Sequence, residues 1–446
     1  MLRKLALAPI AMTLACAPAG ALAAQADEGW SFSGSMRLRH ETVDNQVRPG
    51  FNQSEDLVSL RTTLGAEYNS GPLTLAAEMY DSRVFKGDRR SPISTNEVNT
   101  FEVVQAYASL QGEAGVLGKS RLTAGRMMLN LGSRRLVAAD DYRNTTNSYT
   151  GLRLDAQPAG VRTTFIYVLP QVRLPDGIDN LLDARHHVDR EGSQQVLWGV
   201  LAAKPKTVGP ATLEGYYFRL DETDTRYAAT RDRKLDTYGG RLFVEPKKSR
   251  FDFEVEAIGQ TGTISADLTP TARELEAKAH FVHADAGYTF AHAWKPRLSA
   301  EFDLATGDER GGKFDRFDTL FGMRRADFGP SGIYAAIHRS NIVTPGLRLE
   351  FEPSDRMDAF ISARSMWLEV QEDSFSTTAV RDASGRSGRF AGNQVEGRVR
   401  YWFIEDRLRG EVDALWLDKG RFLREAPNAP RSGDETYLSL NLLASF

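Results

Sequence analysis

The strongest constraint on the fold of this chain is a polar–apolar alternation with a period of two that recurs along almost its whole length. The clearest example is the segment 30–41, in which Phe32 and Leu38 share one face while Arg37 and Arg39 occupy the other. A period of two is that of a β-strand, whose successive side chains point to opposite faces. The chain is therefore expected to form many strands, each with one apolar and one hydrated face.

About 18 such segments can be marked, each of roughly ten residues, with short turns and long polar loops alternating between them. The expected strands are 30–41, 57–68, 73–83, 100–111, 120–130, 149–157, 161–169, 193–204, 211–221, 235–245, 250–260, 273–290, 297–306, 344–352, 357–370, 391–403, 408–418 and 434–446. Short connectors such as 69–72, 157–160 and 405–407 all fall at one end. This asymmetry predicts an all-β transmembrane antiparallel barrel with short periplasmic turns and long extracellular loops.

The two ends of the chain carry export and assembly signals. Residues 1–24 combine Arg3 and Lys4 with a short apolar run and an Ala-x-Ala site, so we expect a signal peptide followed by a barrel over residues 25–446. Cleavage would remove Cys16, the only cysteine, and lower the formal net charge from −3 to −5. At the other end, an amphipathic strand closes on Phe446, which resembles the signal that the bacterial barrel-assembly machinery recognises.

Several other classes of protein fit the sequence poorly. No apolar run after residue 24 is long enough for a membrane-spanning helix. No basic block suggests nucleic acid. A β-propeller or a β-helix would also give many short strands, but no repeat of fixed length is visible. We therefore place the chain in the cell outer membrane, with the lipid bilayer and lipopolysaccharide as partners.

Aromatic residues at the strand ends nearest the short turns support the orientation with those turns in the periplasm. They are Trp30, Tyr68, Phe251, Tyr288, Phe290, Trp402, Phe403 and Phe446.

The lumen face carries both signs of charge. Most of these groups are expected to pair across neighbouring strands, while a subset at a constriction would orient an anionic solute through bidentate hydrogen bonds. The candidate pore-lining residues are Arg37, Arg39, Arg61, Arg126, Arg153, Arg241, Arg348, Arg364, Arg398, Arg409, Glu301 and Asp155. Arg126 is a conditional member, because residues 125–136 break the alternation and a bulge would be needed to turn it inward.

Several segments resemble the alginate export family, whose members are 18-stranded barrels that carry an anionic polysaccharide. The segments are 36–41, 104–107, 125–126, 131–136, 151–154 and 305–308. The resemblance implies an arginine-containing export channel. Met127 stands where the family has glutamine, and Tyr142 where it has tryptophan. The connector 404–407 is too short for the long periplasmic plug of the alginate exporter, which argues against gating of that type and against alginate itself.

The expected function is passive diffusion of anionic or polar solutes, including an acidic polysaccharide or oligosaccharide, with no cofactor and no catalytic or metal site. The alternatives are an uptake porin for small organic anions, an outer-membrane β-barrel enzyme, and an adhesin with a filled lumen. We expect residues 308–343 to form a solvated surface loop, with inward folding as the alternative. Asp176, Asp179, Asn180 and Asp183 are more easily explained as an acidic solvated loop than as a calcium site.

Overall fold

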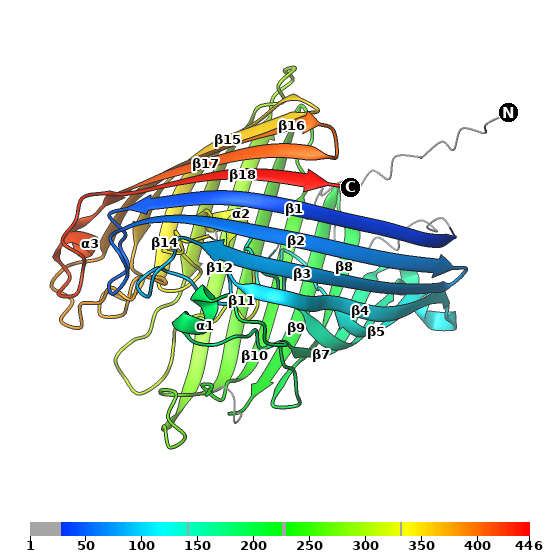
Figure 1. Ribbon diagram of the computed structural model, residues 1–446, viewed down its shortest axis with the longest axis horizontal. Helices are drawn as coiled ribbons and strands as arrows, with labels where there is room; N and C mark the ends of the chain where they lie inside the picture. The colour runs from blue at the N-terminus through cyan, green and yellow to red at the C-terminus, as the bar shows by residue number, and fades with distance from the viewer. Residues whose placement is uncertain (1–27, 141, 225–228, 331) are drawn as a thin grey trace.

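The computed structural model describes residues 28–140, 142–224, 229–330 and 332–446, and within them the chain forms a single closed antiparallel sheet of 18 strands (Figure 1). Each strand pairs with its neighbours in sequence, and β18 pairs with β1. The strands are β1 (Gly29–Asp44), β2 (Ser54–Ser70), β3 (Leu73–Phe85), β4 (Asn99–Glu113), β5 (Lys119–Met127), β6 (Tyr149–Ala156), β7 (Arg162–Pro170), β8 (Gln195–Val208), β9 (Ala211–Glu222), β10 (Lys234–Val244), β11 (Arg250–Ser265), β12 (Glu274–Thr289), β13 (Arg297–Ala305), β14 (Ile342–Ser354), β15 (Met357–Trp367), β16 (Phe390–Ile404), β17 (Leu408–Lys419) and β18 (Glu435–Ser445). The short helices are α1 (Ile178–Leu182), α2 (Arg325–Phe328), α3 (Arg421–Glu425), η1 (Gly115–Leu117) and η2 (Pro158–Gly160). The predicted fold is confirmed, whereas the predicted signal peptide lies outside the described residues.

The two faces of the wall follow the predicted alternation. On β1, Met36 and Leu38 are 52% and 47% exposed, whereas Arg37 and Arg39 between them are only 6% and 1% exposed. Apolar side chains thus point outward, as a lipid-facing surface requires, and the charged ones point into the lumen.

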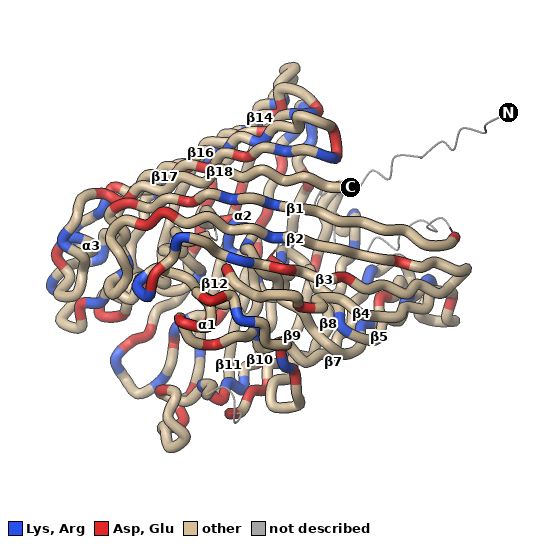
Figure 2. Tube along the Cα trace, in the orientation of Figure 1, with Lys and Arg blue, Asp and Glu red and all other residues tan. Residues whose placement is uncertain are grey.

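The connections divide between the two ends of the barrel as predicted. Gly71 and Pro72 join β2 to β3, and residues 405–407 join β16 to β17. The nine long connections at the other end are called loops 1 to 9 in chain order among the described residues. In Figure 1 these loops lie toward the left and the bottom of the view, with α3 at the far left, while the C-terminus lies at the opposite end of the strands. Figure 2 shows charged residues along the strands and crowded at the loop end.

Exposed aromatic side chains mark the end that carries the short turns. Trp30 is 64% exposed and its ring centroid lies 5.1 Å from that of Tyr68, and Phe251, 80% exposed, lies 4.7 Å from Tyr288. Amphipathic rings favour the interface between lipid and water, so this end matches the predicted periplasmic one. Trp402 also lies here, but on the same face as Arg398 and Arg400, which is the lumen face.

The barrel wall is uneven in height. The strands β5, β6 and β7 have 9, 8 and 9 residues, against 16 and 17 for β1 and β2. The strand expected at 120–130 ends at Met127, because the chain leaves the wall there and turns inward as loop 3 (residues 128–148).

The largest apolar cluster lies within the barrel, where residues of loops 3 and 7 pack against lumen-facing side chains such as Phe281. The core therefore lies inside the barrel, where the inward-folded loops meet the wall.

Candidate functional site

Loop 3 crosses the lumen from one wall to the opposite one. On β1, Arg37 donates hydrogen bonds to the carbonyl oxygens of Tyr142 (3.0 Å) and Arg143 (2.7 Å), and Arg39 donates to Tyr142 (2.5 Å). Arg61 on β2 also donates to the Arg143 carbonyl (3.1 Å). Guanidinium groups of the wall thus hold the backbone of loop 3 at this side.

The other end of loop 3 is held by carboxylates of β11. Arg135 forms ion pairs with Glu254 and, at 2.5 Å, with Glu256, and Ser133 donates a hydrogen bond to Glu256 (3.0 Å). Arg135 is nearly buried, with a side chain 7% exposed. Because ion pairs strengthen where water is excluded, this attachment is expected to be firm.

Loop 7 (residues 306–341) also folds inward, so the expectation of a solvated surface loop over residues 308–343 is wrong. Phe328 and Tyr334 are each 1% exposed, and Arg339 is fully buried. Arg325, on α2, pairs with Glu411 (2.7 Å) and Asp413 (3.2 Å) of β17. The physical reason is composition: a segment with this many apolar residues gains free energy by leaving water, and its arginines find wall carboxylates inside.

Loops 3 and 7 pair with each other to form a plug, the name used below for these two loops together. Val137 and Phe321 form a parallel β-bridge, with Ala138 donating to the Phe321 carbonyl (3.1 Å). Arg135 of loop 3 pairs with Asp327 of loop 7 at 2.9 Å.

The charges at this joint are strongly coupled. Burial by itself would raise the pKa of Asp327, but Arg135 and Arg339 outweigh it, and the pKa lies well below the usual range of a carboxyl. The ring of Tyr142 lies between two cations, 4.0 Å from the Arg39 guanidinium and 3.3 Å from that of Arg325. Cations over an aromatic face are stabilised by its quadrupole, so Tyr142 links both loops to the β1 wall.

Nearer the short turns, the lumen wall carries four arginines that we call the arginine track: Arg348, Arg398, Arg400 and Arg409. Arg348 and Arg398 both lie over Phe360, at 3.7 Å and 4.7 Å from its ring centroid. Arg409 lies 5.3 Å from the Trp402 centroid. Stacking on a ring holds a planar guanidinium still while its N–H edge remains available to a solute.

Two carboxylates balance only part of the track. Asp358 pairs with Arg398 (3.1 Å) and Arg400 (2.9 Å), and Glu350 pairs with Arg348 (3.0 Å) but also with Arg297 of β13 (3.1 Å). Four arginines thus share two acids as ion-pair partners, one of them divided with a fifth arginine. Glu396 and Glu411 lie close enough to interact electrostatically with Arg398 without forming an ion pair with it.

The remaining predicted pore-lining residues form ion pairs with other residues of the wall, as expected for most of the lumen charges. Arg153 pairs with Asp155 (2.8 Å), and Arg241 pairs with Glu254 (2.7 Å). Arg364 pairs with Glu301 (3.1 Å) and also donates to the backbone carbonyl of Asp327 in the plug.

Arg126 occupies a different environment. It shares a face of β5 with the exposed residues Leu122 and Ala124, and its guanidinium pairs with Glu102 (2.7 Å) and Glu191 (2.9 Å). The side chain therefore fastens loop 4 (residues 171–194) to the wall. The nearby register shifts fall in the pairing of β3 with β4, whereas β5 pairs regularly with β4 and β6, so the bulge that would have turned Arg126 into the lumen is not formed in β5.

Sequence reasoning missed the plug residues Arg135, Tyr142, Arg325 and Asp327. A signal was present, because loop 3 holds Leu129, Leu131, Leu136 and Val137, all at most 4% exposed. Apolar residues at this density are unusual in a loop that faces water.

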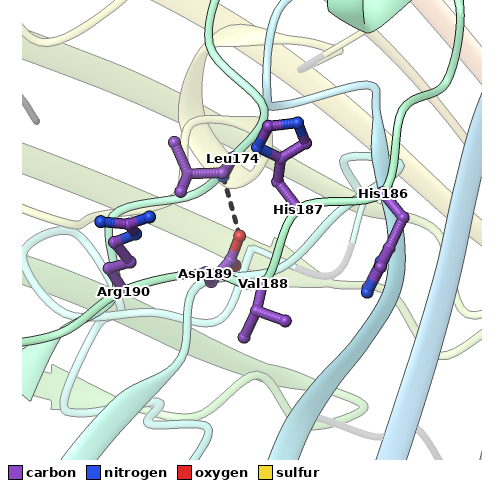
Figure 3. Close-up of a pocket in the computed structure, with 6 residues that line it drawn as sticks. All are labelled: Leu174, His186, His187, Val188, Asp189 and Arg190. Atoms are coloured by element: carbon purple, nitrogen blue, oxygen red, sulfur yellow. Dashed lines mark hydrogen bonds between the residues drawn. The ribbon is translucent and has the colours of Figure 1, made fainter.

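Loop 4 carries a small external pocket of about 410 Å³, lined by Leu174 and residues 186–190 (Figure 3). The Asp189 carboxylate accepts hydrogen bonds from the Leu174 N–H (2.8 Å) and from Asn99 (2.8 Å). Burial and the nearby Glu102 raise the pKa of Asp189 to about 7.

The acidic stretch of loop 4 is engaged by arginines: Asp179 pairs with Arg89 (2.8 Å) and Asp183 with Arg185 (3.2 Å). Within the described ranges, no group of three or more histidine, cysteine or acidic side chains is arranged to hold a metal ion. No helix in the same ranges is long and apolar enough to cross a membrane.

Comparison with known proteins agrees with this architecture. The sequence matches the alginate export family over residues 29–434. No curated protein matches it significantly.

Among solved structures, Pseudomonas aeruginosa OccK1 (OpdK) has a TM-score of 0.60 at 11% identity, covering 93% of this chain and 98% of that one. Acinetobacter baumannii OccAB4 gives 0.57 at 12%, covering 93% and 98%. Pseudomonas aeruginosa OccK2 (OpdF), solved in complex with glucuronate, gives 0.58 at 12%, covering 94% and 96%. At these identities the likeness is one of fold.

Proposed function

The chain belongs to the alginate export family and is an outer-membrane β-barrel channel, and from this premise we propose that it passes acidic oligosaccharides or polysaccharides by passive diffusion. The observation that carries the proposal is the arginine track, where Arg348, Arg398, Arg400 and Arg409 outnumber their acidic partners on one lumen wall. Guanidinium groups bind carboxylates through two parallel N–H···O bonds, so such a track favours uronic acid residues over neutral sugars.

The spacing of the track suits a chain-like solute. Its arginines lie on three strands, and Arg348, Arg398 and Arg409 stack on Phe360 or Trp402. A polyanion can therefore exchange one contact for the next without being released. Binding that is favourable at several weak sites allows conduction, whereas a single tight site would trap the solute.

The experiment is a reversal-potential measurement on protein folded into planar bilayers under a salt gradient. The native channel is expected to prefer chloride over potassium and to be blocked by a trimer of (1→4)-linked glucuronate. Arg398→Gln with Arg409→Gln is expected to lower the anion preference at least twofold and weaken the block. Lys247→Gln, in the exposed β10–β11 turn, is the control. Equal preference in the native and double variants would overturn the proposal.

A second candidate is an uptake porin for small organic anions. It is favoured by the plug, because loops 3 and 7 bury lumen side chains on β1, β11, β15 and β17 and so narrow the passage for a polymer. Block by monomeric glucuronate as strong as block by the trimer would favour this candidate.

The remaining expectations are part of the proposal. Residues 1–24 act as a signal peptide, and the strand ending in Phe446 is recognised by the barrel-assembly machinery. Lipopolysaccharide surrounds the extracellular rim, and the chain has no catalytic activity. These follow from an outer-membrane channel but need direct tests, of which N-terminal sequencing of the mature protein is the simplest.

A further inference from the structure

The periplasmic rim of the barrel has one sector with an excess of positive charge. The turns β8–β9 and β10–β11 are neighbours on this rim, because β9 and β10 pair with each other. Residues 204–210 and 245–250, which form these turns and the strand ends beside them, present five exposed cations and one exposed acid. The acid is Glu245. The cations, which we call the periplasmic basic patch, are Lys204, Lys206, Lys247, Lys248 and Arg250.

The residues described around the patch do not neutralise it. Within the described ranges, none of its five cations forms an ion pair. The two neighbouring turns, residues 157–161 and 290–296, contain no acidic residue. The lumen carboxylates of the same strands, Glu214, Asp252 and Glu254, pair with arginines of the wall. Five cations against Glu245 alone leave an excess of four positive charges.

The opposite sector of the rim has the reverse balance. In the turns β14–β15 and β16–β17, four exposed acids accompany two exposed arginines. One of the acids, Glu352, pairs with Lys295 (2.9 Å). The formal net charge of the whole chain is −3. The positive sector is therefore a local feature of the β8–β11 side of the barrel.

The patch lies among apolar side chains that face outward. Lys204 pairs with Leu213 of β9, which is 47% exposed, and Val208 at the tip of the same turn is 68% exposed. Arg250 directly precedes Phe251, which is 80% exposed and contacts Tyr288 in the aromatic pair at this end. Long cationic side chains lay their stems along apolar surface and keep the charged head in water. The cations therefore stand at the depth of the lipid headgroups.

We propose that the periplasmic basic patch binds the phosphate groups of anionic phospholipids in the inner leaflet of the outer membrane. Clusters of lysine and arginine beside a membrane-spanning segment attract anionic headgroups, and this attraction falls off within a Debye length of about 8 Å in physiological salt. An acidic periplasmic polypeptide would not need the exposed apolar side chains that accompany the cations. The proposal goes beyond the proposed function and holds whichever solute the channel passes.

The test is native mass spectrometry of detergent-folded protein with dioleoyl phosphatidylglycerol or dioleoyl phosphatidylcholine added. These lipids share their acyl chains and differ in the charge of the headgroup. The native protein is expected to retain phosphatidylglycerol about tenfold more readily, because several cations act together. The combined variant Lys204→Gln, Lys206→Gln and Lys248→Gln should lose most of this preference, and raising the ionic strength should weaken it in the native protein.

The matched control is a second triple variant, which removes the same charge from exposed positions of other periplasmic turns: Lys119→Gln with Arg356→Gln and Arg407→Gln. It should keep the native preference. Equal retention of the two lipids by the native protein would overturn the proposal. An equal loss of preference in both triple variants would also overturn it, because retention would then follow net charge and not the patch.

The rival occupant, an acidic polypeptide, is tested with polyglutamate and with protein in nanodiscs of phosphatidylcholine. If polyglutamate binds through the patch lysines and the native protein shows no preference for phosphatidylglycerol, the occupant is a polypeptide and the lipid proposal fails. A preference for phosphatidylglycerol that only the patch variant loses supports the proposal, whether or not polyglutamate also binds.

Discussion

At the scale of single residues, the lumen arginines differ in what they bind, and this difference sets their role. Arg37, Arg39 and Arg61 donate to backbone carbonyls of loop 3 and so act as supports of the plug. Arg398 and Arg409 lie over aromatic rings. They are therefore the lumen arginines that we expect to contact a solute.

Asp327→Asn is expected to loosen the plug. The carboxylate pairs with Arg135 and Arg339. Its loss removes the one carboxylate that pairs with Arg339 among the described residues and one of the three that pair with Arg135, at a cost of about 3 kcal/mol. Single-channel recordings should show a higher mean conductance, with an unchanged far-ultraviolet circular dichroism spectrum. Asp355→Asn, in the exposed β14–β15 turn, should behave as the native protein. A conductance of Asp327→Asn identical to that of the native protein would contradict the role of Asp327 in holding the plug.

Asp189 is expected to make the stability of loop 4 depend on pH. Its pKa is about 7 in the folded protein and about 3.9 in an unfolded chain. The folded state therefore holds the proton more tightly, so this contribution to stability is complete below pH ~4 and is lost as pH rises through ~7. Hydrogen exchange, corrected for intrinsic rates, should show greater protection of loop 4 at pH 5 than at pH 8.

Asp189→Asn should abolish that difference, because an amide has no proton to lose over this range. Asp183→Asn, an exposed position in the same loop, should retain it. A pH dependence that survives in Asp189→Asn would assign the effect to another group.

The sequence could place these residues on a face but could not name their partners. Alternation assigned Arg37 and Arg364 to the lumen, because a strand presents every second side chain to the same side. Their partners Tyr142 and Asp327 come from distant loops, whose path depends on tertiary packing rather than on any local period. Arg126 was assigned to the lumen on the condition of a bulge, but β5 keeps a regular register and the residue lies on the face of Leu122 and Ala124.

At the scale of secondary-structure elements, the closing seam between β1 and β18 depends on a glycine beneath an aromatic ring. Gly34 and Phe446 exchange backbone hydrogen bonds of 3.1 and 3.0 Å. A Cβ atom on Gly34 would stand 2.3 Å from Cζ of Phe446. The terminal ring therefore covers the glycine and packs the seam.

Gly34→Val is expected to hinder closure of the barrel. The added side chain must displace the Phe446 ring, a strain of about 1–3 kcal/mol. The folded fraction, measured as the fast-migrating band of unheated protein on SDS gels, should fall. Gly112→Val is the matched control, since a Cβ there meets nothing within 4 Å. Equal folded fractions would show that the seam tolerates the side chain.

The strands themselves were predictable to within a few residues because lipid on one side and water on the other enforce a strict period. The wall at β5–β7 was the least predictable part, since loop 3 continues the apolar character of β5 while leaving the sheet at Met127. The prediction for loop 7 was wrong for a similar reason. Its length and charge suggested a solvated loop, but the free energy gained by burying its apolar residues places it inside the barrel.

At the scale of the whole molecule, the barrel combines a permanent cylinder with an internal plug made from its own loops. The plug is attached to the wall chiefly by charge, through Arg135 to β11 and Arg325 to β17. The two loops also touch each other through the bridge between Val137 and Phe321. We expect these two loops to separate when a long polyanion passes, because together they reach across the lumen from β1 to β11.

A disulfide across that bridge tests whether separation is needed. Val137→Cys with Phe321→Cys places two thiols at the two paired positions of this bridge, and the Cα spacing of bridge partners suits a disulfide. The only native cysteine is Cys16, within the expected signal peptide, so no other thiol competes. The oxidised protein should lose most flux of the glucuronate trimer into liposomes while chloride current persists, and reduction should restore it. Each single-cysteine variant should be insensitive to oxidant.

Equal trimer flux in the oxidised and reduced double variant would mean that the solute passes beside a closed plug. The passage would then be sought along the arginine track and the low wall of β5–β7.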